Sequence, residues 1–487
     1  MDTEARQSTV KSQKLGRKRK AVQSLASPFI VATNQDTIKP DATSRMLIRH
    51  HVMKGKNRKD VSSQRATLRS WVNQGREFPL PQQTATKWLR GGCLANPLRL
   101  QINDPGLPIT GLKFNIEPCI VQVIHDFISV MTRAMYPAQC CVNSVNEEND
   151  WFEDLSNDAT YFQVVSHTAQ IYFDTVKSRI YGLNAMRYMN RAMFLLRNKL
   201  VYGNEAIANS TIFTILTIAM ASEIFGDLEA AKKHLNGLYQ VLHARGGIGT
   251  LANSRSLQFK CFRLDLRISL KSGSIPLFLT RDNISWNTYL AGPDKLSTTP
   301  IQTTCKMPDI RLVNVWIDLR EFVKAINLAH QTGRNLSTEL FQEALISLQY
   351  RLQCLAYSIQ DLQENFRLSM LALSTSMFLE KDGLELRCTA LAKELRTALQ
   401  LMECDVNNYG LKLTLWLLVV GRVSVLDSPE DSCWLKAKLS TTIQALGLAS
   451  WKEARLVLKT FIWMDAMHDE PGKIIFDDAM CSKNNQI

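Results

Sequence analysis

Residues 209–251 constrain the fold of this chain more than any other stretch, because they carry two successive apolar stripes at helical spacing. The first stripe steps by three and four residues and meets charge only at its far end, at Glu223. The second stripe repeats these steps, and charged or amide side chains occupy its other faces. The stretch therefore predicts two helices joined at Gly226. The apolar positions are Ile212, Ile215, Leu216, Ala219, Met220, Leu228, Ala231, Leu235, Leu238 and Leu242.

The ends of the second predicted helix are marked by suitable residues. Asp227 can accept hydrogen bonds from the free backbone N–H groups at the start, and Arg245 suits the partial negative charge at the end. Gly246 or Gly247 can take the left-handed conformation that terminates a helix. The glycines of residues 246–249 resemble a nucleotide-binding loop only superficially, because such loops follow a strand and these follow a helix.

We therefore expect this pair of helices to be a structural hub and not an active centre. A polar side chain in place of Leu235 is expected to unfold the domain, because it would lie in the apolar stripe. The predicted residues of the structural hub are Leu228, Leu235, Leu238, Leu242, Gly246 and Gly247.

Helical periodicity recurs on both sides of this pair, and the alternation typical of strands is scarce. The sequence thus predicts an all-α fold, an array of antiparallel helices. The longest apparent loop, residues 282–308, is expected to cover a pocket or to form a hinge between halves. We divide the chain into a disordered basic tail (1–44), a basic helical segment with a linker (45–87) and an all-helical domain (88–487). The helical stretches outside the central pair are 118–137, 151–173, 186–200, 259–270 and several between 311 and 462.

The net charge of +13 belongs entirely to the N-terminal segment. Residues 1–90 hold 19 Lys and Arg against 6 Asp and Glu, whereas residues 91–487 hold 39 of each kind. Any attraction to nucleic acid or to an acidic surface must therefore come from the first 90 residues. A basic run in this segment indicates a nuclear import signal, and a merely solubilising tail is the alternative. The run contains Lys14, Arg17, Lys18, Arg19 and Lys20.

A second basic group lies at a short amphipathic helix that is predicted to begin after Asp41 or Thr43 and to end near Gly55. The group predicts contact with nucleic acid or with an acidic partner, and a solvated helix end is the alternative reading. Its members are Arg45, Arg49, Lys54, Lys56, Arg58 and Lys59.

No motif in the sequence indicates catalysis or metal binding. The chain has no GxSxG, HExxH or phosphate-loop motif, and its 11 scattered cysteines include no CxxC pair, which is typical of reduced thiols in an intracellular protein. Asp265 and Asp282 have the chemistry of a carboxylate pair, but nothing in the sequence places them together, and His234 fits a surface or core histidine. We therefore expect no enzyme, cofactor or metal. A membrane span is not expected either, since no stretch reaches about 18 uninterrupted apolar residues.

Five segments carry a resemblance to a known family: Leu47–Lys59, Asn96–Pro108, Val123–Pro137, Asn209–Leu251 and Phe262–Trp286. They resemble the fungal-specific transcription factor family, in particular the helical regulatory domain that follows a zinc binuclear cluster. The resemblance implies a nuclear regulator whose helical domain modulates activity or binds partners. A zinc binuclear cluster needs six cysteine thiolates ahead of that domain, and no cysteine precedes Cys93 in this sequence.

This departure excludes sequence-specific DNA reading by such a cluster for the chain as given. Three explanations stay open: regulation through partners, loose DNA contact by the basic N-terminal segment, or an upstream exon that is missing from the sequence. We expect a nuclear transcriptional regulator that contacts other transcription regulators or chromatin proteins and no membrane. The alternatives are a cytoplasmic helical scaffold or adaptor and, third, an enzyme with a helical pocket.

Overall fold

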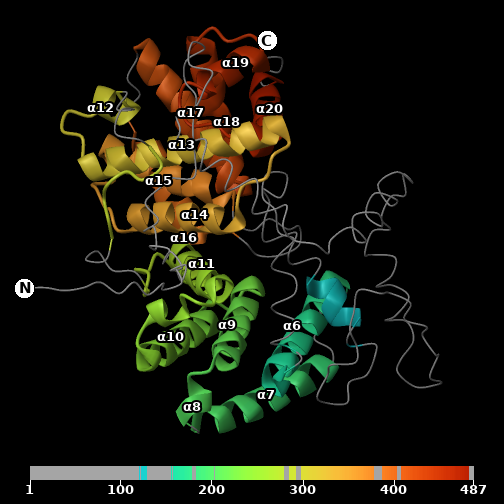
Figure 1. Cartoon of the computed structure of the whole chain (residues 1–487). Coiled ribbons are helices and arrows are strands. Elements are labelled where there is room, and N and C mark those ends of the chain that lie inside the picture. Colours follow the sequence, from blue (N-terminus) through green and yellow to red (C-terminus); the bar gives the residue numbers. More distant parts are fainter. Residues whose placement is uncertain are drawn as a thin grey trace, which may run out of the picture. The chain divides into compact units, whose positions relative to one another are not determined.

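The computed structural model is all-helical over the part of the chain that it describes, which confirms the predicted all-α class (Figure 1). By their contacts the residues separate into Met1–Gly91 and Gly92–Ile487, and every described residue belongs to the second unit. Both predicted basic groups and the expected domain start near residue 88 lie outside the described residues and stay predictions. The described residues are 120, 122–128, 155, 157–177, 183–201, 203–278, 284–291, 298–377, 387–402 and 407–481.

The helices of the first half form one group around the central pair. The helix α7 packs on α6 and α8, and α9 packs against α6, α10 and α11. They are α6 (Ala159–Lys177), α7 (Leu183–Val201), α8 (Gly203–Ala206), α9 (Asn209–Ile224), α10 (Leu228–Arg245), the 3-10 helix η2 (Ile248–Leu251) and α11 (Arg255–Ser272).

The helices of the second half form another group, in which α17 packs against α15, α18, α19 and α20. They are α12 (Pro300–Thr304), α13 (Ile310–Thr332), α14 (Thr338–Gln353), α15 (Leu362–Thr375), α16 (Thr389–Leu401), α17 (Asn408–Ser424), α18 (Pro429–Ala445), α19 (Trp451–Leu458) and α20 (Asp465–Cys481).

The ends of α10 agree with the sequence prediction. The Asp227 carboxylate accepts a hydrogen bond from the Ala230 N–H at 2.9 Å, so it caps the helix, and Gly246 ends the helix with a φ of 109°. Gly226 joins the two helices with a φ of 91°. Such positive φ values strain any residue with a Cβ, which explains why glycine stands at both turns. Arg245 donates to the Ile207 carbonyl at 3.1 Å and so ties the end of α10 to the start of α9.

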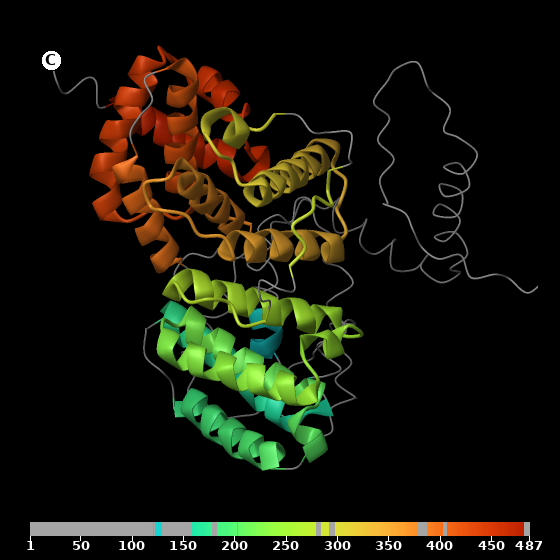
Figure 2. The ribbon, with the colours of Figure 1, turned by 90° about the vertical axis from the view of Figure 1, so that its left-hand side faces the viewer.

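Two hydrophobic cores fill the described structure, and α11 contributes to both. The first core lies among the helices from α6 to α11, and the second lies among α11 to α20. One face of α11 supplies Leu257, Cys261, Leu264 and Ile268 to the first core. The opposite face supplies Phe259, Leu266 and Leu270 to the second core. Accordingly α11 packs against α9 and α10 on one side and α14 and α16 on the other (Figures 1 and 2).

A buried ion cluster joins α9 to α11 beside the first core. The Glu223 carboxylate lies 2.7 Å from Nη2 of Arg267 and 2.5 Å from Nζ of Lys271, and all three side chains are buried. Burial alone would raise the pKa of Glu223, but the charges and hydrogen bonds of Arg267 and Lys271 outweigh it and lower the pKa. The charge at the far end of the first apolar stripe is therefore an internal link between helices.

Two helices of the second half, α12 and α20, were not anticipated from the sequence. The short helix α12 lies inside the expected loop 282–308 and begins with a capping box in which Thr299 and Gln302 satisfy each other's backbone N–H groups. The last helix, α20, continues through Pro471, a residue that normally ends a helix. A glycine follows that proline, and a Cβ on Gly472 would come within 2.7 Å of the Trp451 ring, so the close packing of α19 on α20 requires glycine there.

None of the described helices is both long enough and apolar enough to span a bilayer. The six cysteines of the described residues form no disulfide with one another, and three of them are buried.

We expect Leu235→Asp to abolish cooperative folding of the helical domain, because Leu235 is 3 % exposed within the first core. Leu235→Ala should lower the free energy of unfolding by about 2–5 kcal/mol. Lys233→Asp, which places aspartate at an exposed position of the same helix, should leave the melting temperature nearly unchanged. Circular dichroism melts of the three variants test this, and a folded Leu235→Asp protein would contradict it.

The buried side chain of His468 should make the stability of the folded protein depend on pH. It is 1 % exposed, its ring lies 5.3 Å from that of Trp463, and burial lowers its pKa to about 4. The unfolded chain takes up a proton near pH 6.5 and the folded chain does not, so stability from the neutral ring is present above pH 6.5 and is lost as pH falls toward 4.

Lowering the pH from about 7 to about 5 should therefore lower the free energy of unfolding by about 2 kcal/mol through His468. The variant His468→Gln should not show this loss. Urea unfolding at both pH values measures the difference. The exposed His330 provides the control, because His330→Gln should keep the pH dependence of the unchanged protein. Equal pH dependence of stability in the unchanged protein and in His468→Gln would contradict the role assigned to His468.

Candidate ligand pocket

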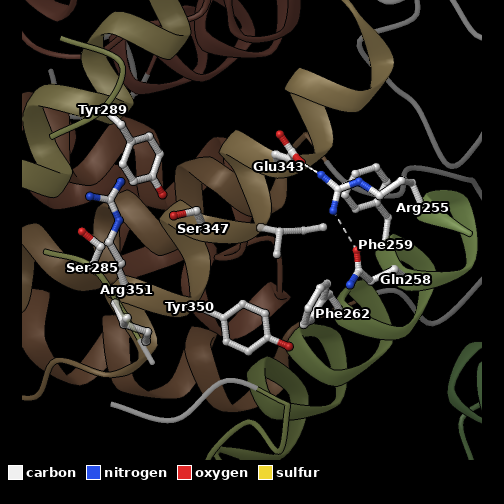
Figure 3. Close-up of a pocket in the computed structure, with 12 residues that line it drawn as sticks. Arg255, Gln258, Phe259, Phe262, Ser285, Tyr289, Glu343, Ser347, Tyr350 and Arg351 are labelled. Atoms are coloured by element: carbon white, nitrogen blue, oxygen red, sulfur yellow. Dashed lines mark hydrogen bonds and ion pairs between the residues drawn. The ribbon is translucent and has the colours of Figure 1, made fainter. Parts of the chain in front are cut away.

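A cavity of about 380 Å³ lies between α11 and α14, with residues 284–291 at its edge (Figure 3). Its apolar wall is mostly aromatic and consists of Phe259, Phe262, Ile284, Tyr289, Ile346 and Tyr350. Its polar wall consists of Arg255, Gln258, Ser285, Glu343, Ser347 and Arg351. The described part of the loop 282–308 thus contributes to a pocket, one of the two roles expected for it.

Helical spacing explains why these residues share one cavity. On α11 the lining side chains recur at 255, 258, 259 and 262, which places them on one face. On α14 they recur at 343, 346, 347, 350 and 351, again one face. Because the two helices pack side by side, these faces meet, and each supplies one aromatic ring to an edge-to-face pair in which the centroids of Phe262 and Tyr350 are 5.7 Å apart.

A buried ion pair fixes one end of the pocket. Arg351 Nη2 donates to Asp318 Oδ2 at 2.8 Å, and the two side chains are 1 % and 0 % exposed. The other carboxylate oxygen, Oδ1, accepts hydrogen bonds from the backbone N–H groups of Tyr289 and Leu290 at 3.1 and 3.0 Å. Asp318 therefore attaches the loop to α13 and α14 at the same time.

A second buried carboxylate fixes the start of the same connection. Asp265 accepts hydrogen bonds from the backbone N–H groups of Leu277 and Phe278, each at 2.9 Å. It also accepts from the Tyr350 hydroxyl at 2.7 Å. Burial raises the pKa of Asp265 despite these hydrogen bonds, and burial next to Asp265 raises the pKa of Tyr350 well above its ordinary value. The neighbouring residues 350 and 351 of α14 thus each bind one of the two carboxylates that hold the connection.

The guanidinium group of Arg351 lies against the Tyr289 ring, with 4.6 Å between its central carbon and the ring centroid (Figure 3). Nη1 points to the Asn287 carbonyl at 3.4 Å, and Nη2 is taken by Asp318. Nε is buried and has no acceptor among the described residues. The hydrogen-bonding groups of the buried guanidinium are therefore satisfied only in part by the described residues.

Charges at the other end of the pocket are balanced. Arg255 forms ion pairs with Glu339, at 3.1 Å, and with Glu343, and it donates to Gln258 at 2.9 Å. Its guanidinium also lies over the Phe259 ring at 5.4 Å (Figure 3). Both arginines of the pocket consequently face carboxylates, so the cavity carries no strong net charge.

The chemistry of the lining suits binding. It contains arginine, glutamate, serine and tyrosine but neither histidine nor cysteine, the side chains that titrate closest to neutral pH. Among the described residues, no group of three or more His, Cys, Asp and Glu side chains is arranged to hold a metal ion. Asp265 is a structural clamp behind the lining residue Tyr350 and does not itself line the pocket, and its imagined partner Asp282 lies outside the described residues. His234, on α10, is partly buried, and burial lowers its pKa.

The residues of the predicted structural hub lie outside this pocket. Leu235, Leu238 and Leu242 are buried in the first core, and Leu228 is partly buried against it. Gly246 and Gly247 both have positive φ, and the 3-10 helix η2 follows them, which fits a helix stop. The two N-terminal basic groups fall on residues that the structure does not describe.

The sequence analysis named no residue of the pocket wall. The available signal was the pattern of α14, in which glutamate, serine, tyrosine and arginine interrupt an apolar helix on one side. That pattern is ordinary for a half-exposed helix. Only the packing against α11 distinguishes it from a solvated face.

Comparison with known proteins gives no match: no protein-family model, no curated protein and no solved structure matches this chain.

Removing the Asp318 charge should loosen the pocket. Asp318→Asn leaves the buried Arg351 without its counter-ion, so the free energy of unfolding should fall by about 3–5 kcal/mol. The exposed pair of Arg387 and Asp427 provides the control, because Asp427→Asn should change stability by less than about 1 kcal/mol. Chemical unfolding compares the two, and equal effects would contradict the role assigned to Asp318.

Proposed function

We propose that this protein is a nuclear transcriptional regulator that acts through protein contacts of its helical domain. The resemblance to the fungal-specific transcription factor family and the basic N-terminal segment motivate the nuclear role. The all-helical structure of the described residues is compatible with such a regulatory domain. Direct DNA contact by the basic N-terminal segment is a secondary part of this proposal.

The observation that carries the proposal is an exposed apolar and basic face on α7. Four large apolar side chains of this helix are at least 44 % exposed, which is unusual for residues of this type on one helix. They recur at helical spacing and share one side of the helix. They are Met186, Phe194, Leu200 and Val201.

The charges of α7 indicate the kind of partner. The helix carries Arg187, Arg191 and Arg197 at exposed positions, and no acidic residue occurs in its sequence. The guanidinium of Arg191 lies 5.7 Å from the centroid of the Phe194 ring, so charge and apolar surface are adjacent. An amphipathic segment with acidic and apolar side chains would complement this face. Binding of another transcription regulator through this face would account for its exposed apolar and basic side chains.

We expect the double variant Met186→Ser, Phe194→Ser to fold normally and to lose most of its effect on transcription. Both side chains are more than half exposed, so their loss removes little core packing. The readout is expression of genes whose chromatin the tagged protein occupies. Leu456→Ser changes a side chain of similar exposure, 61 %, on α19 and should leave regulation unchanged. Unchanged regulation in the double variant would contradict the role of α7.

Cellular location distinguishes the proposal from a cytoplasmic scaffold or adaptor, which could use the same face of α7. The tagged protein should enter the nucleus, and alanine substitution of Arg17–Lys20 should reduce entry. Exclusively cytoplasmic staining of the unchanged protein would favour the scaffold. Nuclear entry that is unaffected by the substitution would remove the import role from that basic run.

A further inference from the structure

We propose that the exposed face of α7 binds the exposed face of α20 in a second copy of this chain, so that copies associate head to tail. The inference rests on the contact role proposed above for α7 and names its partner, but it does not depend on the nuclear role. A partner for α7 needs a helix with acidic and apolar side chains at its surface, and the chain itself contains one in α20.

The exposed positions of α20 follow one side of the helix. They recur at intervals of three and four residues, whereas its buried residues occupy the opposite side. Ile474 lies in the middle of the exposed side and is 67 % exposed. Three carboxylates accompany one amine there, so this side has a formal net charge of −2. The exposed residues are Glu470, Lys473, Ile474, Asp477, Asp478 and Cys481.

The charges on both faces are available for contact with another molecule. Asp478 is bonded to Lys436 at 2.7 Å, but no described residue forms an ion pair with Glu470 or Asp477. The same holds on α7, where no described residue forms an ion pair with the exposed arginines. Opposite charges on two exposed faces attract each other, and they favour encounters in which the faces meet.

Charged and apolar side chains have similar spacing on the two helices. On α7, an arginine lies one turn before Phe194 and another lies one turn after it. On α20, carboxylates lie one turn before and one turn after Ile474. Where Phe194 packs against Ile474, each arginine therefore lies at the height of a carboxylate, in whichever direction the helices run. The charged residues are Arg191 and Arg197 on α7 and Glu470 and Asp477 on α20.

Charge disfavours the two symmetric arrangements. Packing of α7 on α7 would bring the arginines of both copies together, and packing of α20 on α20 would do the same with the carboxylates. Like charges that face each other across an interface cost free energy. The mixed arrangement, α7 on α20, avoids this cost and replaces it with attraction.

The two faces of one chain do not meet each other. The helix α7 packs on the first core and α20 on the second, and α11 contributes to both cores. In consequence α7 and α20 lie on opposite sides of α11 (Figures 1 and 2). Each copy thus offers two different faces at separate places, and repeated contact of this kind forms a ring or an open chain of copies.

Sedimentation velocity of the purified full chain tests the association. We expect the sedimentation coefficient to rise with protein concentration between about 2 µM and about 200 µM in about 50 mM salt. Because the contacting charges are exposed, the association constant should fall at least roughly tenfold in about 500 mM salt.

Charge reversal locates the contact. Arg191→Glu, Arg197→Glu makes α7 acidic, and Glu470→Arg, Asp477→Arg makes α20 basic. Each double variant alone should stay monomeric, because its two faces then carry charge of the same sign. An equimolar mixture should associate again, since the unchanged α7 of one variant meets the unchanged α20 of the other. All four side chains are exposed, so equal melting temperatures should show that both variants fold.

The control reverses two exposed charges elsewhere. Arg334→Glu, Lys452→Glu changes the net charge as much as the α7 variant does and should leave the association unchanged.

Three results would overturn the proposal. An unchanged protein that is monomeric at about 200 µM would show that the faces do not bind each other. Association of Arg191→Glu, Arg197→Glu alone would show that something other than α7 occupies α20. A mixture of the two variants that stays monomeric would exclude contact between α7 and α20.

Failure of self-association is distinguishable from failure of the proposed function. A monomeric protein whose effect on transcription is lost in Met186→Ser, Phe194→Ser would use α7 for a different regulator. A self-associating protein that keeps its effect on transcription in that variant would have the contact without the regulatory role.

Discussion

The buried pair of Arg351 and Asp318 is the interaction on which the organisation of the pocket depends. Removing two charges from water is expensive, and their attraction offsets the cost only where the remaining hydrogen-bonding groups are also satisfied. Here the carboxylate meets this condition through two backbone N–H groups of the loop, so the ion pair and the loop conformation require each other. The guanidinium meets it only in part, since Nε has no acceptor among the described residues.

The double-sided burial of α11 sets the second constraint. A helix that contributes to one core keeps a solvated face, but α11 buries Leu264 in one core and Leu266 in the other. Polar side chains on such a helix must find partners inside the protein. Arg267 and Lys271 do so at Glu223, and Asp265 does so at Tyr350 and the loop. Most of its charged residues are therefore connections to other elements.

Much of the fold was predictable from local patterns. The cap at Asp227, the turn at Gly226 and the stop at Gly246 follow from rules that act within a few residues, and all three hold. The helix α20 lies beyond the last helical stretch predicted, which ends at residue 462, and it contains Pro471, a residue that normally ends a helix. The predicted disorder and basic contacts of the N-terminal segment fall on residues that the structure does not describe.

The pocket was beyond sequence reasoning for a different reason. The contacts of its buried carboxylates join residues that are far apart in the chain, Asp265 with Tyr350 and Asp318 with Arg351. The composition of α11 and α14 shows that charged residues exist there, but periodicity alone assigns them to a solvated face. Their partners become visible only when the two helices lie side by side.

The adjacency of Tyr350 and Arg351 limits how α14 can vary in length. Successive residues of a helix point about 100° apart, and here these two directions match the two carboxylates that hold the connection after α11. One residue inserted in the first turns of α14 would rotate both side chains away from their partners in a single step. A change in helix register at this place therefore alters the whole pocket at once, whereas a point substitution alters one contact.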